Sequence, residues 1–356
     1  VLGPRLSGKT VLLRYVDQVL AEQHGYISIY IDLMDIQAPT LQRFFSGLMH
    51  QAAGRFHDRT GMQIEVPEES LISSAVFRGL ICELIEVCHR NVVLIIEHLE
   101  AVPVDLVQAL LTSLRAAYMD QQGMDSRATV VVSGALSLAT LTVGESSPFR
   151  GIAERVFIGD LSEDDSLELI REYLDLGGVT ATRQAMRRLL RGTVGDQYLI
   201  RKICQRSINL ARVSSSNRLR TGNVNQIITD FVREDLTSYA PLLEAVSLIE
   251  EDPDLLQCIL LLLEQGIVHK SRLPLPLSPD LDPLYLTGVV EQVDGGSYRL
   301  QNQIYRRFLI EYFHPGRVGR TMAAAGRWDQ ALDYLENGVD RGDGLTGAGL
   351  PAATVP

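Results

Sequence analysis

The sequence lacks any apolar run long enough to cross a bilayer. Its longest apolar runs, Val92 to Ile96 and Ile259 to Leu263, fall far short of the roughly 20 residues that a transmembrane helix needs. It also lacks an initiating Met and a basic segment followed by an apolar stretch, so it shows no secretory signal. We therefore expect a cytoplasmic protein with no membrane partner.

Cysteine is scarce, and positive charge does not dominate. The four cysteines, Cys82, Cys88, Cys204 and Cys258, form no C-x-x-C pair and lie in apolar, helix-like stretches, which predicts buried thiols. The formal net charge of -11 disfavours nucleic acid as an average partner, because non-specific binding depends on cationic groups that neutralise phosphates.

The first part of the chain alternates helical and strand patterns. Apolar residues recur at helical spacing over Val11 to Ala21, and the near-continuous apolar runs are typical of strands buried in a parallel sheet. The expected strands are Tyr26–Leu33, Val92–Ile96, Thr129–Val132 and Arg155–Ile158, and the expected crossover helices are Leu41–Phe56, Leu71–Cys88 and Val104–Met119. This pattern predicts an α/β nucleotide-binding domain over residues 1–160, with a parallel sheet whose N-terminal strand is truncated.

The rest of the chain has a different pattern. From Ser162 a helical pattern continues without a convincing strand, which predicts an all-helical domain over residues 161–238. Apolar helices followed by a hairpin pattern at Gly288–Val293 and Ser297–Leu300 predict a winged-helix domain over residues 239–314. Residues 315–340 resemble the start of a tetratricopeptide-type helix pair, and residues 341–356 have the composition of a flexible linker to further protein.

A phosphate-binding loop stands at the start of the chain. The segment Gly3-Pro4-Arg5-Leu6-Ser7-Gly8-Lys9-Thr10, followed by Val11, matches G-x-x-x-x-G-K-[ST] without exception. In such a loop the backbone N–H groups approach phosphate oxygens, the lysine holds the β- and γ-phosphates, and the threonine hydroxyl binds Mg²⁺. The alternative is a Gly-rich turn before an ordinary helix. The pattern predicts a nucleotide as partner, with ATP and Mg²⁺ as cofactors.

An acidic residue at the end of a later buried strand is the second element that phosphate-loop chemistry requires. Here the strand ends in Glu97-His98-Leu99-Glu100. We predict that Glu97 binds Mg²⁺ through water, although its carboxylate lies one C–C bond farther out than that of an aspartate. His98 is a candidate general base or a structural histidine. Glu100 is a candidate cap for the next helix.

Two further candidate catalytic residues follow later strands. Ser133, at the end of the Thr129–Val132 strand, is a candidate sensor of the γ-phosphate or the attacking water, or it simply turns the chain. Arg150 and Arg155 flank the last predicted strand, where a guanidinium could reach phosphates of this or a neighbouring subunit, or remain solvated.

Residues 183–220 carry an excess of positive charge in an otherwise acidic chain. Ten arginines and lysines stand there against the single acid Asp196. This region is a candidate surface for nucleic acid, for the nucleotide, or for an acidic surface of another domain of the same polypeptide. The interleaved aromatic residues that would favour stacking on single strands are absent.

Taken together, these motifs resemble the AAA-like domains of STAND-class signal-transduction ATPases, which are relatives of AAA+ proteins. The resemblance is carried by Gly3–Thr10, Val92–Glu100, Val131–Ala135, Gly192–Ile200 and Leu284–Arg307 and covers residues 1–314. It implies a nucleotide switch followed by a helical lid and a winged helix, and homo-oligomers are common in this class.

The chain departs from that family at two points. Gln197 stands where the family often carries the proline of a Gly-x-Pro element that contacts the base. Glu97-His98 replaces the commoner Asp-Glu pair, which favours a slow switch over a motor. The resulting expectation is an ATP-binding regulatory switch with slow or no hydrolysis. The alternatives are a DNA-associated ATPase of the origin-recognition or transposition type and a pseudo-ATPase scaffold.

Overall fold

The computed structural model describes residues 1–3, 7–36, 40–121, 126–134, 147–154, 156, 158–214, 217–234, 239–275, 284, 287–293 and 296–332. The phosphate-loop residues Pro4, Arg5 and Leu6 lie outside these ranges, as do Arg155 and the predicted linker 341–356. The chain divides after Gly159 into two compact units, which are described separately below.

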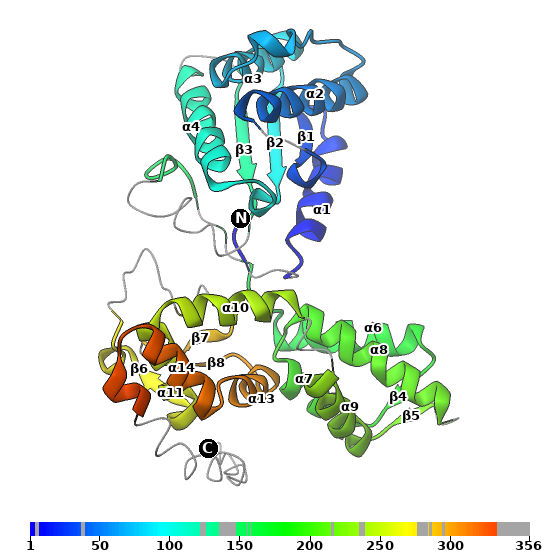
Figure 1. Cartoon of the computed structure of the whole chain (residues 1–356). Helices are drawn as coiled ribbons and strands as arrows, with labels where there is room; N and C mark the ends of the chain where they lie inside the picture. Colours follow the sequence, from blue (N-terminus) through cyan, green and yellow to red (C-terminus); the bar gives the residue numbers. More distant parts are fainter. Residues whose placement is uncertain are drawn as a thin grey trace. The chain divides into compact units, whose positions relative to one another are not determined.

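The first unit is a parallel β-sheet covered by helices (Figure 1). Its elements in chain order are α1 (Lys9–Ala21), β1 (Tyr26–Asp32), α2 (Leu41–Thr60), α3 (Ser74–Cys88), β2 (Asn91–Glu97), α4 (Val104–Asp120) and β3 (Ala128–Val132). Short 3₁₀ turns occur at Leu33–Asp35, Glu69–Leu71 and Leu99–Ala101.

The strand order is β1-β2-β3, so that β1 is an edge strand among the residues that the structure describes. Register places Asp32 of β1 beside Glu97 of β2, and Ile96 beside Val132 of β3. The carboxyl ends of the three strands therefore meet at one edge, where ligands bind in open α/β sheets.

Leu2 extends the sheet beyond β3. It forms a parallel bridge with Gly134, its N–H donates to the Val156 carbonyl at 2.9 Å, and its own carbonyl accepts from the Ile158 N–H at 2.9 Å. The pairing at Val156 and Ile158 is strand-like, at the position where the sequence predicts a last strand.

The two faces of this sheet carry different cores. Ile27, Ile29 and Ile31 of β1 face a large core that helices α2, α3 and α4 complete. On the other face, Leu13 of α1 packs with Tyr30 and with Val93 and Ile95 of β2. The alternation of side chains along β1 thus sends its apolar residues to one face and Ser28 and Tyr30 towards α1.

Serine and threonine hydroxyls cap the starts of several helices. Thr40 accepts from the Arg43 N–H at α2, Ser73 from the Val76 N–H at α3, and Ser162 from the Asp165 N–H at the first helix of the second unit. Such caps satisfy N–H groups that a helix cannot pair internally.

The second unit begins with a mainly helical region. Its elements are α6 (Glu163–Leu176), β4 (Thr180–Ala181), α7 (Arg183–Thr193), α8 (Gln197–Val213), β5 (Arg218–Leu219) and α9 (Thr221–Glu234). The prediction of a region without strands misses the parallel pair β4–β5. Two residues per strand are too few to produce a period-2 pattern in the sequence.

A winged-helix region completes the second unit. Its elements are α10 (Ala240–Glu251), α11 (Pro253–Gln265), β6 (Ile267–His269), β7 (Val290–Val293), β8 (Ser297–Leu300), α13 (Gln303–Tyr312) and α14 (Pro315–Ala324), with a 3₁₀ turn at Lys270–Arg272. The predicted hairpin is β7–β8, and β6 adds a third antiparallel strand in the order β6-β8-β7. Helix α14 ends at Ala324, and Gly326 beyond it has a φ of 76°.

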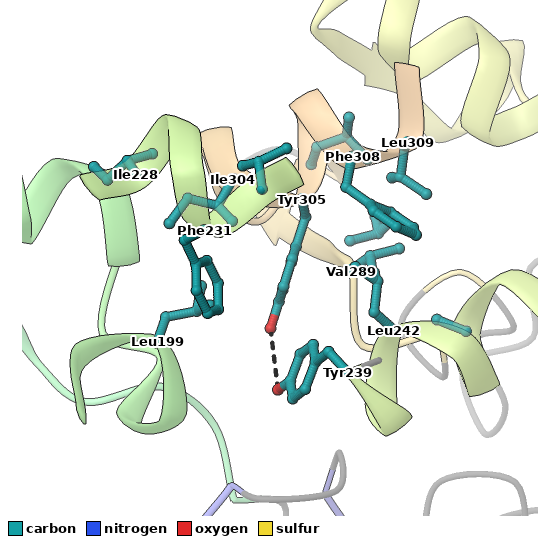
Figure 2. Packing of buried hydrophobic residues seen from close by; sticks show 14 of the residues in the cluster. Leu199, Ile228, Phe231, Tyr239, Leu242, Val289, Ile304, Tyr305, Phe308 and Leu309 are labelled. Atoms are coloured by element: carbon teal, nitrogen blue, oxygen red, sulfur yellow. Dashed lines mark hydrogen bonds between the residues drawn. The ribbon is translucent and has the colours of Figure 1, made fainter. Parts of the chain in front are cut away.

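One apolar core runs through the second unit. It includes Leu199 of α8 and Phe231 of α9 from the helical region, and Val289, Ile304 and Phe308 from the winged-helix region. Figure 2 shows residues of both regions in this core. The two regions thus share their interior.

A buried polar group lies within that core. Tyr305 of α13 points towards Tyr239, and their hydroxyl oxygens lie 3.5 Å apart (Figure 2). The Tyr305 hydroxyl also donates to Asp196, whose carboxylate caps α8. Burial raises the pKa of the Asp196 carboxyl, and the hydrogen bonds from Tyr305 and from backbone N–H groups oppose that rise. The cap of α8 is therefore fixed by a residue of the winged-helix region.

Among the described residues, no helix is both long enough and apolar enough to span a membrane.

The candidate phosphate and magnesium site

The described part of the phosphate loop leads directly into helix α1. Gly8 has a φ of 90°, a conformation that glycine adopts without the steric cost of a Cβ atom, and α1 starts at Lys9. Lys9 is buried, and its Nζ donates to the Gly3 carbonyl at 2.8 Å. The first turn of α1 contains no acidic residue, while Val11 points to solvent. The positive dipole end of α1 is thus suited to an anion.

Close packing explains the first glycine of the motif. A Cβ at Gly3 would lie 2.8 Å from the Ser7 Oγ and 3.0 Å from the Ile158 carbonyl oxygen. Gly3 therefore lets the loop fold tightly against the strand-like segment at Ile158.

Glu97 lies at the centre of the site. It ends β2, is 1% exposed, and accepts a hydrogen bond from the Thr10 hydroxyl at 2.6 Å on Oε1. The Tyr30 hydroxyl donates to its other oxygen, Oε2. These bonds offset part of the cost of burying a carboxylate, and they place the two predicted Mg²⁺ ligands, Thr10 and Glu97, in direct contact.

His98 follows Glu97 in a backbone conformation that is uncommon outside glycine. Its φ is 61°, and its Nδ1 lies 2.8 Å from the Asp32 Oδ1. The contact with Asp32 thus occupies the Nδ1 side of the ring. Left-handed residues of this kind concentrate at functional sites. The contact with Asp32 fixes the orientation of the His98 ring. A fixed ring is compatible both with a general base and with a structural histidine.

Two serine hydroxyls near the strand ends have no partner among the described residues. Ser133 is 1% exposed and follows β3, where its N–H donates to the Ile96 carbonyl at 2.8 Å. Its Oγ is buried and unpaired, and so is the Oγ of Ser7 in the phosphate loop. Buried hydroxyls without partners are rare, and a ligand or a bound water would satisfy them.

The remaining predicted residues lie elsewhere. Arg150 is exposed and lines a cavity of about 800 Å³ beside β3, together with Leu2 and Val132. Gln197 is the first residue of α8 in the second unit. The structure brings Glu97 and Thr10 into contact, and the roles of these two residues, like those of Arg150 and Gln197, stay predictions.

Sequence reasoning missed Tyr30 and Asp32. Asp32 is the last residue of β1, and the rule that parallel strands end at one edge of the sheet would have placed it at the same edge as Glu97. Tyr30 carries no comparable signal, because an aromatic residue within a strand is usually core. Its contact with Glu97 depends on the parallel register of β1 and β2.

The residues present suit a nucleotide-bound Mg²⁺ better than a metal held by protein alone. Among the described residues, no group of three or more His, Cys, Asp or Glu side chains could hold a metal ion. Mg²⁺ at phosphate sites needs only one or two protein oxygens, because phosphates and waters complete its shell. Thr10 and Glu97 fit that requirement.

No family model matches the chain, and no curated protein matches it. Several solved structures are similar to the chain. The Walker-type ATPase PABY2304 of Pyrococcus abyssi is similar over 86% of this chain and 89% of its own, with 16% identity and a TM-score of 0.53. The ORC2 protein of Aeropyrum pernix, solved in ADPNP and ADP complexes, is similar over 91% of this chain and 87% of its own, with 13% identity and a TM-score of 0.52.

A more distant similarity is to the ORC1 protein of Aeropyrum pernix in complex with DNA, with 13% identity over 87% of this chain and 86% of its own and a TM-score of 0.43. At these identities similarity establishes the fold alone. The predicted fold class is confirmed: an AAA+-like parallel sheet, followed by a helical lid region and a winged helix.

Proposed function

We propose that this chain is an ATP-binding regulatory switch of the STAND type, with Mg-ATP held by the phosphate loop and slow or no hydrolysis. The observation that carries the proposal is the hydrogen bond between Thr10 and Glu97 beside the buried Lys9. This contact joins the end of β2 to the start of α1, which is where phosphate-loop proteins hold a hydrated Mg²⁺.

Slow turnover follows from how Glu97 and His98 are held. Both Glu97 oxygens already accept from hydroxyls, and Asp32 is paired with His98, so neither of these two carboxylates is placed to activate water as a strong base. Phosphate-loop switches without a full catalytic set hydrolyse at about 10⁻³ to 10⁻² per second. A switch, unlike a motor, needs only that occupancy of the site stabilises one arrangement over another.

Phosphate release by the full chain tests the proposal. For the wild type we expect turnover on the order of 10⁻³ to 10⁻² per second. For Glu97→Gln we expect no turnover above background, because the variant loses the charge that holds Mg²⁺. Its affinity for Mg-ATP should stay within a few fold of the wild-type value. Glu100→Gln serves as control, because Glu100 lies three residues beyond in the 3₁₀ turn. Turnover of tens per second would contradict a switch, and binding without any release would leave the pseudo-ATPase scaffold.

A second candidate function is that of a DNA-associated ATPase, which a cluster of arginines favours. Burial and the neighbouring charges of Arg307 and Arg191 lower the pKa of the Arg188 guanidinium, so three cations from α7 and α13 lie close together. Arg191 and Arg307 are exposed. A concentration of guanidinium groups on one surface is suited to phosphate backbones.

Salt-dependent DNA binding separates the two functions. If the cluster binds DNA, the slope of log affinity against log salt should flatten by about one unit for each arginine among Arg188, Arg191 and Arg307 changed to Gln. Arg320→Gln, an exposed position on α14, should leave the slope unchanged. Equal slopes for all variants, or no measurable DNA affinity, would rule this candidate out.

A further inference from the structure

A polar pocket beside β1 has no part in the function proposed above. Its volume is about 240 Å³, and its lining residues come from α1, β1 and the last turns of α2. Helix α1 contributes Arg14 and Asp17, and β1 contributes Ser28 and Tyr30. At about 30 Å³ per water in the liquid, the volume equals that of roughly eight waters, which suits a small solute.

Unpaired polar atoms line this pocket. Ser28 is 1% exposed, and its Oγ has no hydrogen-bond partner among the described residues. The Oδ1 of Asp17 is likewise buried and unpaired, while its Oδ2 accepts from Arg59 at 3.0 Å. Because buried polar atoms without partners are rare, a ligand that offers an acceptor to Ser28 and a donor to Asp17 would complete the pocket.

The pocket also carries an excess of positive charge. Arg55, Asp58 and Arg59 of α2 line it together with Arg14 and Asp17, which gives three guanidinium groups and two carboxylates. The Arg14 guanidinium is held 3.7 Å from the centre of the Tyr30 ring by a cation–π contact. Guanidinium groups pair with carboxylates and phosphates through two parallel hydrogen bonds. The complementary ligand is therefore a small oxyanion that also carries an O–H or N–H donor.

Tyr30 connects this pocket to the phosphate site. Tyr30 lines the pocket, and its hydroxyl donates to the Glu97 Oε2. A ligand that shifts Arg14 or Tyr30 thereby acts on the carboxylate next to Thr10.

We propose that this pocket binds a small carboxylate or phosphate bearing a hydrogen-bond donor, and that Tyr30 transmits its occupancy to Glu97. The proposal that the pocket binds an anion depends on the pocket alone. The proposal that Tyr30 transmits occupancy rests on the proposed function, because it requires that Glu97 belong to a nucleotide site.

Calorimetry of the full chain with malate, succinate and inorganic phosphate tests binding. If carboxylates are the natural ligands, we expect malate to bind at least fivefold more tightly than succinate, which has no hydroxyl. If phosphates are the natural ligands, we expect inorganic phosphate to bind. Arg55→Gln should weaken binding at least tenfold and Ser28→Ala about fivefold. Ser28→Ala removes only an unpaired hydroxyl, so its melting temperature should not fall.

Two control variants show where the ions bind. Lys9→Ala removes the phosphate-loop cation, and Arg43→Gln changes an exposed arginine of α2 that pairs with Glu69 outside the pocket. Both should leave malate and phosphate affinity at this pocket unchanged. Absence of binding by malate and phosphate alike, or equal affinities in wild type, Ser28→Ala and Arg55→Gln, would overturn the site.

Tyr30→Phe tests the transmission, because it keeps the ring under Arg14 and removes the hydroxyl that reaches Glu97. A saturating anion should change wild-type Mg-ATP affinity at least fivefold and leave that of Tyr30→Phe unchanged, while both bind the anion equally. By linkage, Mg-ATP must change the anion affinity by the same factor. If a saturating anion leaves the Mg-ATP affinity of the wild type unchanged, Tyr30 does not transmit occupancy to Glu97. If the protein binds the anion but no ATP, the proposed function is refuted and the proposed anion site is retained.

Discussion

Replacing Lys9 by alanine is expected to weaken Mg-ATP binding by about 100-fold or more, equivalent to about 2.7 kcal/mol. Lys9 begins α1 and is buried, with its Nζ held by the Gly3 carbonyl inside the loop. An ammonium group fixed in this way loses little side-chain entropy when a phosphate arrives, so most of its charge-assisted hydrogen bonding appears as affinity. Calorimetric titration with Mg-ATP and Mg-GTP measures the loss and the base preference together.

The control for Lys9 is Lys202→Ala. Lys202 lies on α8 in the second unit, with its Nζ 5.5 Å from the centre of the Tyr198 ring, so this change also removes one ammonium group from the chain. We expect Lys202→Ala to bind Mg-ATP as the wild type does. If the folded Lys9→Ala protein binds as tightly as the wild type, the segment Gly3–Thr10 is a turn and not a phosphate site.

Replacing Phe231 by alanine is expected to destabilise the second unit by about 3–5 kcal/mol. Phe231 of α9 is fully buried and belongs to the core that joins the helical region to Ile304 and Phe308 of α13 (Figure 2). The change removes an aromatic ring and leaves a cavity that packed neighbours fill only in part. Because the core is continuous, the loss should appear in α13 as well as in α9.

Native-state hydrogen exchange measures that spread. The slowest amides of α13 and α9 should lose protection together in Phe231→Ala. Phe56→Ala, at a fully buried position of α2, is the matched change in the first unit and should leave α13 protection unchanged. Normal protection of α13 in Phe231→Ala would show that the winged-helix region holds its own core.

The sequence was sufficient for the elements whose patterns are long. Strand β2 is buried on both faces and therefore consists of a continuous apolar run, so its predicted span, Val92–Ile96, falls short of Asn91–Glu97 by only one residue at each end. Helices α2 and α4 repeat their apolar residues over several turns, and both predicted starts are correct. The predicted end of α4 is one residue short, and that of α2 is four residues short. Strand β6 was missed because its three residues, which only Gly266 separates from α11, are too few to show an alternating pattern.

The candidate site could be predicted only where a motif carries it along the chain. Lys9 and Thr10 belong to a contiguous pattern, and Glu97 ends an obvious strand. The contacts of Tyr30 with Glu97 and of Asp32 with His98 span 67 and 66 positions, and both depend on which strand lies beside which. Strand order results from tertiary packing, and one sequence gives no local pattern for it.

The shared interior of the second unit bears on how this protein is cut into pieces for expression. A boundary between residues 238 and 239, which the sequence alone suggests, would separate Phe231 from Ile304 and remove Tyr305 from the Asp196 cap. Either piece would then present apolar surface to water and tend to aggregate. The physical place to divide the chain is after Gly159, where one compact unit ends and the next begins.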